Sequence, residues 1–326
     1  MKNIGIIIET DTRESDAGKS NNSEVKDICF GMITLARQKN CELFAFVFNS
    51  EIKALKPDLE SFGITNIVDV ALAAKHQNNP AIRAKAMVNA VKKFNIHAVL
   101  GLCTPMGKDL LPRMAAHLDA PLVMDCIHVD FENFFAKTSQ YSGKAIATIK
   151  ITGDIPVFGV RPNSIEQIKA QASARILKFD GENLVSKKFI VIKTGEYDKS
   201  ADINLAEADI IIAGGRGMQN SENFNLLSKC AKRLHAAVGA SRVAVDEGWV
   251  PYSMQVGQTG EKVNPKVYIA CGISGSIQHF AGMKTSGMVI AINTDGNAAI
   301  MSNCDYYVKA DVLKIIPKLT KLLKNE

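Results

Sequence analysis

The sequence lacks any apolar run close to the ~20 residues that span a bilayer, and it lacks paired cysteine spacings. Its seven cysteines are scattered without a Cys-x-x-Cys motif, which argues against a disulfide framework, a structural zinc site and an iron–sulfur cluster. The first apolar run has no small-residue cleavage site behind it and meets Glu9 and Asp11 at once. These absences predict a globular protein of the cytoplasm, or of an equivalent interior compartment, that begins with a strand and not with a signal peptide.

Signatures of catalysis and of nucleic-acid binding are also missing. There is no Gly-x-Ser-x-Gly elbow, no His-Glu-x-x-His motif, no Walker lysine motif and no obvious pair of carboxylates. The net charge of +6 is spread over both halves, without a basic block or interleaved aromatics, which argues against a nucleic-acid partner. What is present is a globular composition, 47% hydrophobic and 22% charged over 326 residues, which is long enough for two domains.

Apolar runs alternate with helical periodicities, which predicts an α/β protein with domains at residues 1–197 and 198–326 and a polar linker near residue 198. Residues 3–8 predict a strand buried in a parallel sheet. A polar loop is expected over residues 10–22, followed by a helix that Ser23 caps and that carries Val25 to Ala36 on one face. In the rest of the first domain we expect strands at 43–48, 66–72, 98–102 and 187–192, helices at 80–94 and 107–118, and an antiparallel addition made of segments 122–131, 144–151 and 156–160.

The second domain restarts the same alternation. A helix is expected from a cap at Asn220 or Ser221 through Val238, with Gly239 ending it, and Pro317 is placed at the first position of a final helix. The expected strands lie at 210–213, 241–245, 288–293 and 306–309, with a further one starting at residue 267. This order predicts a second, Rossmann-like parallel sheet.

Three strand ends of the second domain share small residues followed by polar or cationic ones. They are Gly214–Gly217, Ala240–Arg242 and Gly272–His279. Ligands of open α/β sheets bind at the carboxyl ends of the strands. One crevice there would offer guanidiniums, hydroxyls and a glycine-rich turn at a helix start to an anionic ligand such as a diphosphate.

Each of these features also has a simpler explanation when it is taken alone. Arg216 and Arg242 can be surface ion pairs, His279 a structural histidine, and Gln258-Thr259 a turn between glycines. Their joint occurrence favours a shared dinucleotide site. Because the chain has little catalytic machinery of its own, such a ligand is expected to carry the chemistry as a cofactor.

Six stretches of the second domain are long and specific: AGGRGMQNSENF, LHAAVGASRVAVDEGW, MQVGQTG, VYIACGISGSIQHFAGM, VIAIN and KADVLKIIP. Weaker ones follow in the first domain at 107–125, 143–150 and 160–164. In this order they resemble the alpha subunit of electron transfer flavoproteins over essentially the full length. The resemblance implies an adenine nucleotide alpha hydrolase-like fold for the first domain and a Rossmann-like FAD-binding fold for the second.

The resemblance further implies one FAD held mainly by the second domain, with no catalytic residue and no metal ligand. It suggests that Arg242, Thr259 and His279 lie near the isoalloxazine, where a guanidinium and an imidazole would stabilise negative charge on the reduced ring. It assigns Arg216 and the Ser274–Ser276 backbone to the pyrophosphate side, and Asn293 and Asp311 to the adenosine end. The full set of implied contacts is Arg216, Ser241, Arg242, Val256, Gly257, Gln258, Thr259, Ser274, Gly275, Ser276, Ile277, Gln278, His279, Asn293, Asp311 and Val312.

Electron transport in a heterodimer is the function that the resemblance implies. The first domain would pair with a beta subunit of similar fold, and the FAD domain would swing about the linker near residue 198. Electrons would come from acyl-CoA or other flavoprotein dehydrogenases, as in fatty acid beta-oxidation, and go to an acceptor oxidoreductase. Whether the complex also bifurcates electrons stays open. One departure is Glu261, where many relatives carry a basic residue.

Two other functions remain alternatives at this point. One is a NAD-dependent oxidoreductase with its own small-molecule site, against which the missing Gly-x-Gly-x-x-Gly fingerprint counts. The other is an adenine-nucleotide-binding regulatory protein. Turnover of a small substrate without any partner protein would favour the first, and the absorbance of the bound ligand would test the second.

Overall fold

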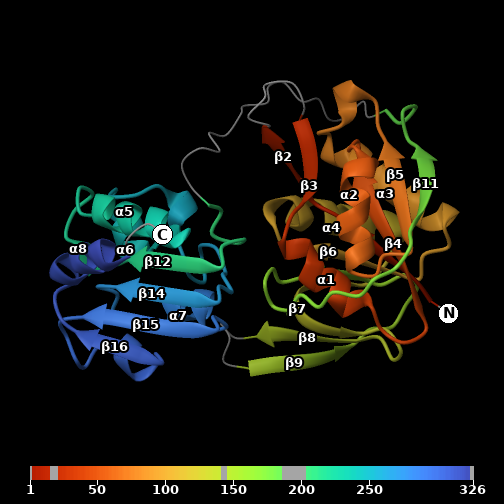
Figure 1. Cartoon of the computed structure of the whole chain (residues 1–326). Helices are drawn as coiled ribbons and strands as arrows, with labels where there is room; N and C mark the ends of the chain where they lie inside the picture. Colours follow the sequence, from red (N-terminus) through yellow and green to blue (C-terminus); the bar gives the residue numbers. More distant parts are fainter. Residues whose placement is uncertain (1, 15–20, 141–144, 186–202, 324–326) are drawn as a thin grey trace. The chain divides into compact units, whose positions relative to one another are not determined.

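The computed structural model describes residues 2–14, 21–140, 145–185 and 203–323. The chain divides into two compact units, one formed from Met1–Ser139 with Ile146–Gly195 and the other from Gln140–Ala145 with Glu196–Glu326. Each unit is built around its own sheet (Figure 1), which confirms the two-domain α/β fold. The strand expected at 187–192 and the boundary expected near residue 198 lie outside the described residues.

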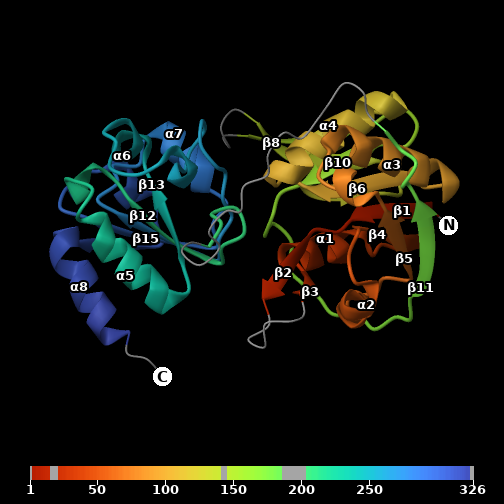
Figure 2. The same ribbon diagram turned by 90° about the horizontal axis from the view of Figure 1, so that it is seen from above.

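The first unit contains a nine-stranded sheet in the order β11-β5-β4-β1-β6-β10-β7-β8-β9. The pairs from β11 through to β7 are parallel, and β7 with β8 is antiparallel. Helices α1 and α2 cover one face, and α3 and α4 the other (Figure 2). The bounds are β1 Lys2–Ile7, β2 Thr10–Glu14, β3 Asn21–Val25, α1 Ile28–Ala36, β4 Cys41–Phe48, α2 Ile52–Ser61, β5 Asn66–Ala71, α3 Pro80–Lys93, β6 Ala98–Leu102, α4 Pro105–Leu118, β7 Leu122–Asp130, β8 Phe135–Gln140, β9 Ala145–Lys150, β10 Val157–Val160 and β11 Arg175–Asp180.

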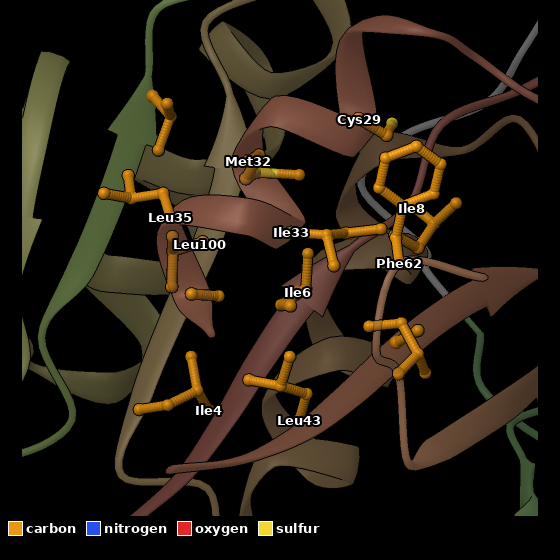
Figure 3. Close-up of a cluster of buried hydrophobic side chains, with 14 of the residues drawn as sticks. Ile4, Ile6, Ile8, Cys29, Met32, Ile33, Leu35, Leu43, Phe62 and Leu100 are labelled. Atoms are coloured by element: carbon orange, nitrogen blue, oxygen red, sulfur yellow. The ribbon is translucent and has the colours of Figure 1, made fainter. Parts of the chain in front are cut away.

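The core of this unit forms where the continuous apolar run of β1 packs under α1. Ile4 and Ile6 of β1 are fully buried against Met32 and Ile33 of the helix (Figure 3). Burying side chains of this size is worth about 1.5–3 kcal/mol each before chain entropy is counted. This packing explains why the first apolar run is an internal strand, as predicted.

Three expectations for the first unit are wrong. The expected polar loop contains β2 and β3, which form an antiparallel pair with Thr10 opposite Val25 and Glu14 opposite Asn21. Ser23 and Val25 therefore belong to a strand, and α1 begins only after Asp27. A two-stranded ribbon can satisfy its backbone without an apolar face, so periodicity does not reveal it. The segments 122–131 and 156–160 do not run antiparallel to the rest of the sheet. The buried strand β10 lies between β6 and β7 and is parallel to both, and the antiparallel pairing is that of β7 with β8. The helix α2 and the strands β8 and β11 were not predicted.

The second unit contains a five-stranded sheet in the order β13-β12-β14-β15-β16, with every pair parallel. Figure 1 shows β12, β14, β15 and β16 side by side, with their arrows pointing the same way. Helices α5 and α8 pack on one face and α7 on the other (Figure 2). The bounds are β12 Ile210–Gly214, α5 Phe224–Leu234, β13 Ala237–Ala240, α6 Arg242–Asp246, β14 Val267–Cys271, α7 Ile277–Met283, β15 Met288–Asn293, β16 Tyr306–Lys309 and α8 Val312–Leu322.

Three boundaries of the second unit differ from the expectation. Helix α5 ends at Leu234 because His235 takes a left-handed conformation, with φ of 48°, which places Val238 and Gly239 in β13. The segment 241–245 is not a strand but the start of α6, which Ser241 precedes in an extended conformation. The expected position of Pro317 is also wrong: the Asp311 side chain accepts a hydrogen bond from Leu313 N (2.9 Å), so α8 begins five residues before that proline.

Candidate functional site

The residues predicted to bind the cofactor follow the ends of all five strands in the second unit. Because the strands are parallel, their carboxyl ends lie at one edge of the sheet. This edge carries Arg216 after β12, Ser241 and Arg242 after β13, Ser274–His279 after β14, Asn293 at the end of β15, and Asp311 and Val312 after β16.

The turns after β12 and β14 contact each other directly through backbone atoms, at glycine residues. Gly215 N donates to Cys271 O (2.9 Å), and Gly217 N donates to Gly272 O (3.0 Å). A Cβ on Gly215 would lie 2.4 Å from Gly272 O, so no larger residue fits there. This close approach holds Arg216 at the edge, with its side chain exposed and without a partner among the described residues.

The turn between β14 and α7 is held from two sides. Gly275 has a φ of +79°, and a Cβ there would lie 2.5 Å from Ile300 N. Ser276 Oγ accepts a hydrogen bond from His279 N (3.3 Å) and caps α7. Asn293 Nδ2 donates to the carbonyl oxygen that follows Gly272, on Ile273 (2.9 Å). Asn293 therefore supports this turn, a structural role that the sequence did not predict.

Residues 255–261 form a loop that is closed by a backbone hydrogen bond between its ends and is hydrogen-bonded to the chain on both sides of it. Glu261 N donates to Gln255 O (2.7 Å), while Val256 N donates to Ala240 O (2.9 Å) and Gln258 N to Gln278 O (2.8 Å). The loop thus bridges the end of β13 and helix α7. It brings the predicted contacts Val256, Gly257 and Gln258 between Ser241 and His279.

Thr259 at the exposed tip of this loop is positioned by two residues that sequence reasoning missed. Gln255 is 3% exposed and its Nε2 donates to Thr259 Oγ1 (2.9 Å). The hydroxyl of Tyr252 donates to the carbonyl oxygen of Thr259. Because Thr259 Oγ1 already accepts, its own hydrogen is free to donate outwards. No sequence signal marks either residue, because the burial of Gln255 appears only in the folded chain.

Two buried side-chain atoms in the described part of the chain make no hydrogen bond of normal geometry, and both belong to the predicted site. They are Ser241 Oγ and His279 Nδ1. His279 Nε2 lies 2.9 Å from the hydroxyl of Tyr268. Buried polar atoms are normally hydrogen-bonded. Two such atoms without a partner, on either side of the 255–261 loop, therefore indicate that a ligand supplies the missing hydrogen bonds.

Burial lowers the pKa of His279 to about 4, and a weaker hydrogen-bond interaction of the ring with the Val256 backbone opposes this shift. The imidazole is therefore neutral at physiological pH. A neutral ring has one N–H donor and one acceptor nitrogen, so His279 can offer Nδ1 to a ligand as only one of the two.

The remaining predicted residues are spread along the same edge. Arg242 forms the surface ion pair that was its simpler explanation, with Nε 3.1 Å from Asp246 Oδ2, but side-chain exposures of 69% and 60% make this pair weak. Ser274, Ile277 and Gln278 are exposed, whereas Val312 is buried at the start of α8. Guanidiniums, hydroxyls and unpaired buried polar atoms at one sheet edge fit an anionic ligand rich in hydrogen-bonding groups.

Other classes of site find no support in the residues that the structure covers. Within residues 2–14, 21–140, 145–185 and 203–323, no three His, Cys, Asp or Glu side chains gather as metal ligands. Across the same ranges, no helix is long and apolar enough to cross a membrane.

Comparison with known proteins matches both units to one family. Residues 17–183 match the electron transfer flavoprotein domain and residues 204–284 the electron transfer flavoprotein FAD-binding domain. The chain is 34% identical over 311 residues to an electron transfer flavoprotein subunit alpha of Syntrophomonas wolfei, which covers 94% of this chain and 98% of that relative.

Two further relatives give the same assignment. An electron transfer flavoprotein subunit alpha of Pseudomonas aeruginosa is 43% identical over 228 residues, covering 70% of this chain and 73% of the relative. Protein FixB of Clostridium saccharobutylicum is 41% identical over 305 residues, covering 89% of each. The chain therefore belongs to the electron transfer flavoprotein alpha-subunit family, and FAD is the cofactor of its C-terminal domain.

Proposed function

We propose that this chain is the FAD-carrying subunit of a heterodimeric electron carrier. The observation that carries the proposal is the pair of unpartnered buried atoms, Ser241 Oγ and His279 Nδ1, at the carboxyl edge of the second sheet. FAD is rich in phosphate, hydroxyl and ring acceptors, so the residues present at this edge fit it. The family membership supports electron transfer as the activity.

The predicted contact residues divide this edge into three parts. Arg216 and the turn at 274–276 would hold the pyrophosphate, and Arg242, Thr259 and His279 would face the isoalloxazine. Asp311, which follows β16, would face the adenosine. Asn293 would act at that end mainly by holding the β14–α7 turn, since its amide donates to Ile273 O.

Bound FAD supplies the redox chemistry, and the protein binds, orients and electrostatically supports it. The exposed guanidinium of Arg242 follows β13 at this edge and would favour negative charge on a reduced ligand. His279 is neutral and contributes a hydrogen bond instead of a charge. Because both loops of the site are tied by backbone hydrogen bonds, this arrangement needs little reorganisation when electrons arrive.

The partners of the chain follow from its family. The first unit would pair with a beta subunit, leaving the FAD domain to meet acyl-CoA or other flavoprotein dehydrogenases and an acceptor oxidoreductase, with a hinge near residue 198. A cytoplasmic location stays a prediction from the sequence. Electron bifurcation stays a second candidate, which two FAD per heterodimer would support and one FAD would contradict.

Co-expression with the beta subunit tests this proposal. The purified pair should be a yellow heterodimer that oxidises no small substrate by itself but passes electrons between two other flavoproteins. Steady turnover of a small molecule with NAD and without any partner protein would instead support the oxidoreductase alternative. A colourless ligand that absorbs only as adenine would support the regulatory alternative.

A further inference from the structure

The hydroxyl of Tyr268 has a single hydrogen-bond partner in the part of the chain that the structure describes. Tyr268 lies on β14, is 0% exposed, and its hydroxyl lies 2.9 Å from His279 Nε2. The two rings are tilted by 60°, with centroids 6.1 Å apart. Burial raises the pKa of Tyr268 well above its usual range, so the hydroxyl keeps its proton.

Two arrangements of hydrogens are compatible with this contact. In the first, Tyr268 donates to Nε2 and His279 carries its proton on Nδ1. In the second, Nε2–H donates to the tyrosine oxygen, the tyrosine hydrogen has no acceptor among the described residues, and Nδ1 is a bare acceptor.

The first arrangement leaves fewer unmet groups. It leaves only Nδ1–H without a partner, whereas the second leaves the Tyr268 O–H and the bare Nδ1 unpaired in a fully buried place. An unpaired buried donor is costly. Because the His279 ring is neutral at physiological pH, it carries one proton, on either Nδ1 or Nε2.

We propose that Tyr268 is a positioning residue that holds His279 in the tautomer protonated at Nδ1, so that Nδ1–H donates to an acceptor of the bound flavin. This inference rests on the proposed function, because it takes the flavin as the ligand of Nδ1. It also specifies the ligand chemistry: the group that meets His279 is a carbonyl or an unprotonated ring nitrogen, not an N–H.

The variant that tests this role is Tyr268→Phe, which removes one oxygen and keeps the ring that fills the core. The matched control is Tyr307→Phe on β16, whose side chain is 64% exposed. The full-length chain is labelled with ¹⁵N-histidine and measured by NMR without flavin and with FAD. A His279→Gln variant assigns the His279 signals among those of the six histidines.

The wild-type chain should show His279 protonated at Nδ1, with an unprotonated, hydrogen-bonded Nε2, in both states. In flavin-free Tyr268→Phe, the Nε2 signal should lose its hydrogen-bond shift and both tautomers should be populated. A wild-type ring protonated at Nε2, or a Tyr268→Phe ring with an unchanged Nε2 signal, would overturn the proposal.

The second readout is FAD itself. Tyr268→Phe should weaken FAD binding by about fivefold, the equivalent of one hydrogen bond, and should lower the flavin potential, while Tyr307→Phe changes neither. An unchanged affinity and potential in Tyr268→Phe would also overturn the proposal. Failure of the wild-type heterodimer to bind FAD would refute the proposed function, whereas FAD binding with His279 protonated at Nε2 would refute only the role of Tyr268.

Discussion

Replacing Ser241 by alanine should have opposite effects on the flavin-free and the flavin-bound protein. Ser241 precedes α6 without capping it, and its buried Oγ has no partner among the described residues. An unpaired buried polar group costs roughly 1–3 kcal/mol. Removing the hydroxyl should therefore leave the flavin-free protein equally stable or stabilise it by up to about 1 kcal/mol, after allowance for the small space left behind.

The same substitution removes a hydrogen bond to the ligand. We expect the FAD dissociation constant of Ser241→Ala to rise about five- to tenfold, which corresponds to about 1–1.4 kcal/mol. Urea unfolding of the flavin-free chain and a fluorescence titration with FAD measure the two effects separately. A loss of 1 kcal/mol or more in unfolding free energy with unchanged FAD affinity would show that the hydroxyl is structural and refute the reasoning.

Ser276→Ala is the matched control for this experiment. Its Oγ accepts a hydrogen bond from His279 N (3.3 Å) and caps α7. Loss of an N-cap costs about 0.5–2 kcal/mol, so Ser276→Ala should destabilise the flavin-free chain. The two serines lie at the same edge of the sheet, and opposite changes in the unfolding free energy would separate a buried hydroxyl without a partner in the protein from one that caps a helix.

Three further predictions concern the same edge. The pKa of His279 falls from 6.5 to about 4 on folding, so the unfolded chain binds more protons than the folded chain between these pH values. The free energy of unfolding should therefore fall by up to about 3 kcal/mol as the pH drops from 6.5 to 4. His279→Gln should remove this part of the pH dependence in urea titrations, and an unchanged dependence of unfolding free energy on pH would contradict the prediction. Gly275→Ala places a Cβ 2.5 Å from Ile300 N at a φ of +79° and should lower the unfolding free energy by about 2 kcal/mol or more. The control Gly248→Ala, at a φ of +70° with nothing within 4 Å, should lower it by about 1 kcal/mol. Equal losses in the two variants would show that the close approach at Gly275 is unimportant. Arg242→Ala should lower the flavin potential by a few tens of millivolts, since an exposed charge contributes up to about 1 kcal/mol; Arg242→Lys should retain most of it, and an unchanged potential in the alanine variant would refute the electrostatic role.

Much of the fold could be predicted because buried parallel strands and amphipathic helices leave strong patterns. The strand predicted at residues 3–8 is β1 (Lys2–Ile7), and the strand predicted to start at residue 267 is β14 (Val267–Cys271). The failures occurred where local chemistry outweighs periodicity. His235 turns the chain by a left-handed residue that no apolar spacing reveals, and Asp311 starts a helix five residues before the proline chosen as its beginning.

The candidate site shows a similar division. The strand ends carrying Arg216, Ser241 and His279 could be predicted, because a parallel sheet brings its carboxyl ends to one edge. The residues that position these groups could not, since Gln255 and Tyr268 read as ordinary loop and core residues. Their roles depend on contacts across 4 and 11 residues of sequence, Gln255 with Thr259 and Tyr268 with His279, which only the folded chain brings together.

A redox-active FAD held at the carboxyl edge of the C-terminal sheet should accept electrons from a flavoprotein dehydrogenase. An anaerobic titration tests it most directly: the purified heterodimer is mixed with a trace of a flavoprotein dehydrogenase and its substrate, and the flavin absorbance is followed. At least one FAD per alpha chain should bleach, and Ser241→Ala should retain FAD more weakly. A flavin that stays oxidised in the presence of competent donors, or a complex that retains FAD equally well in that variant, would contradict it.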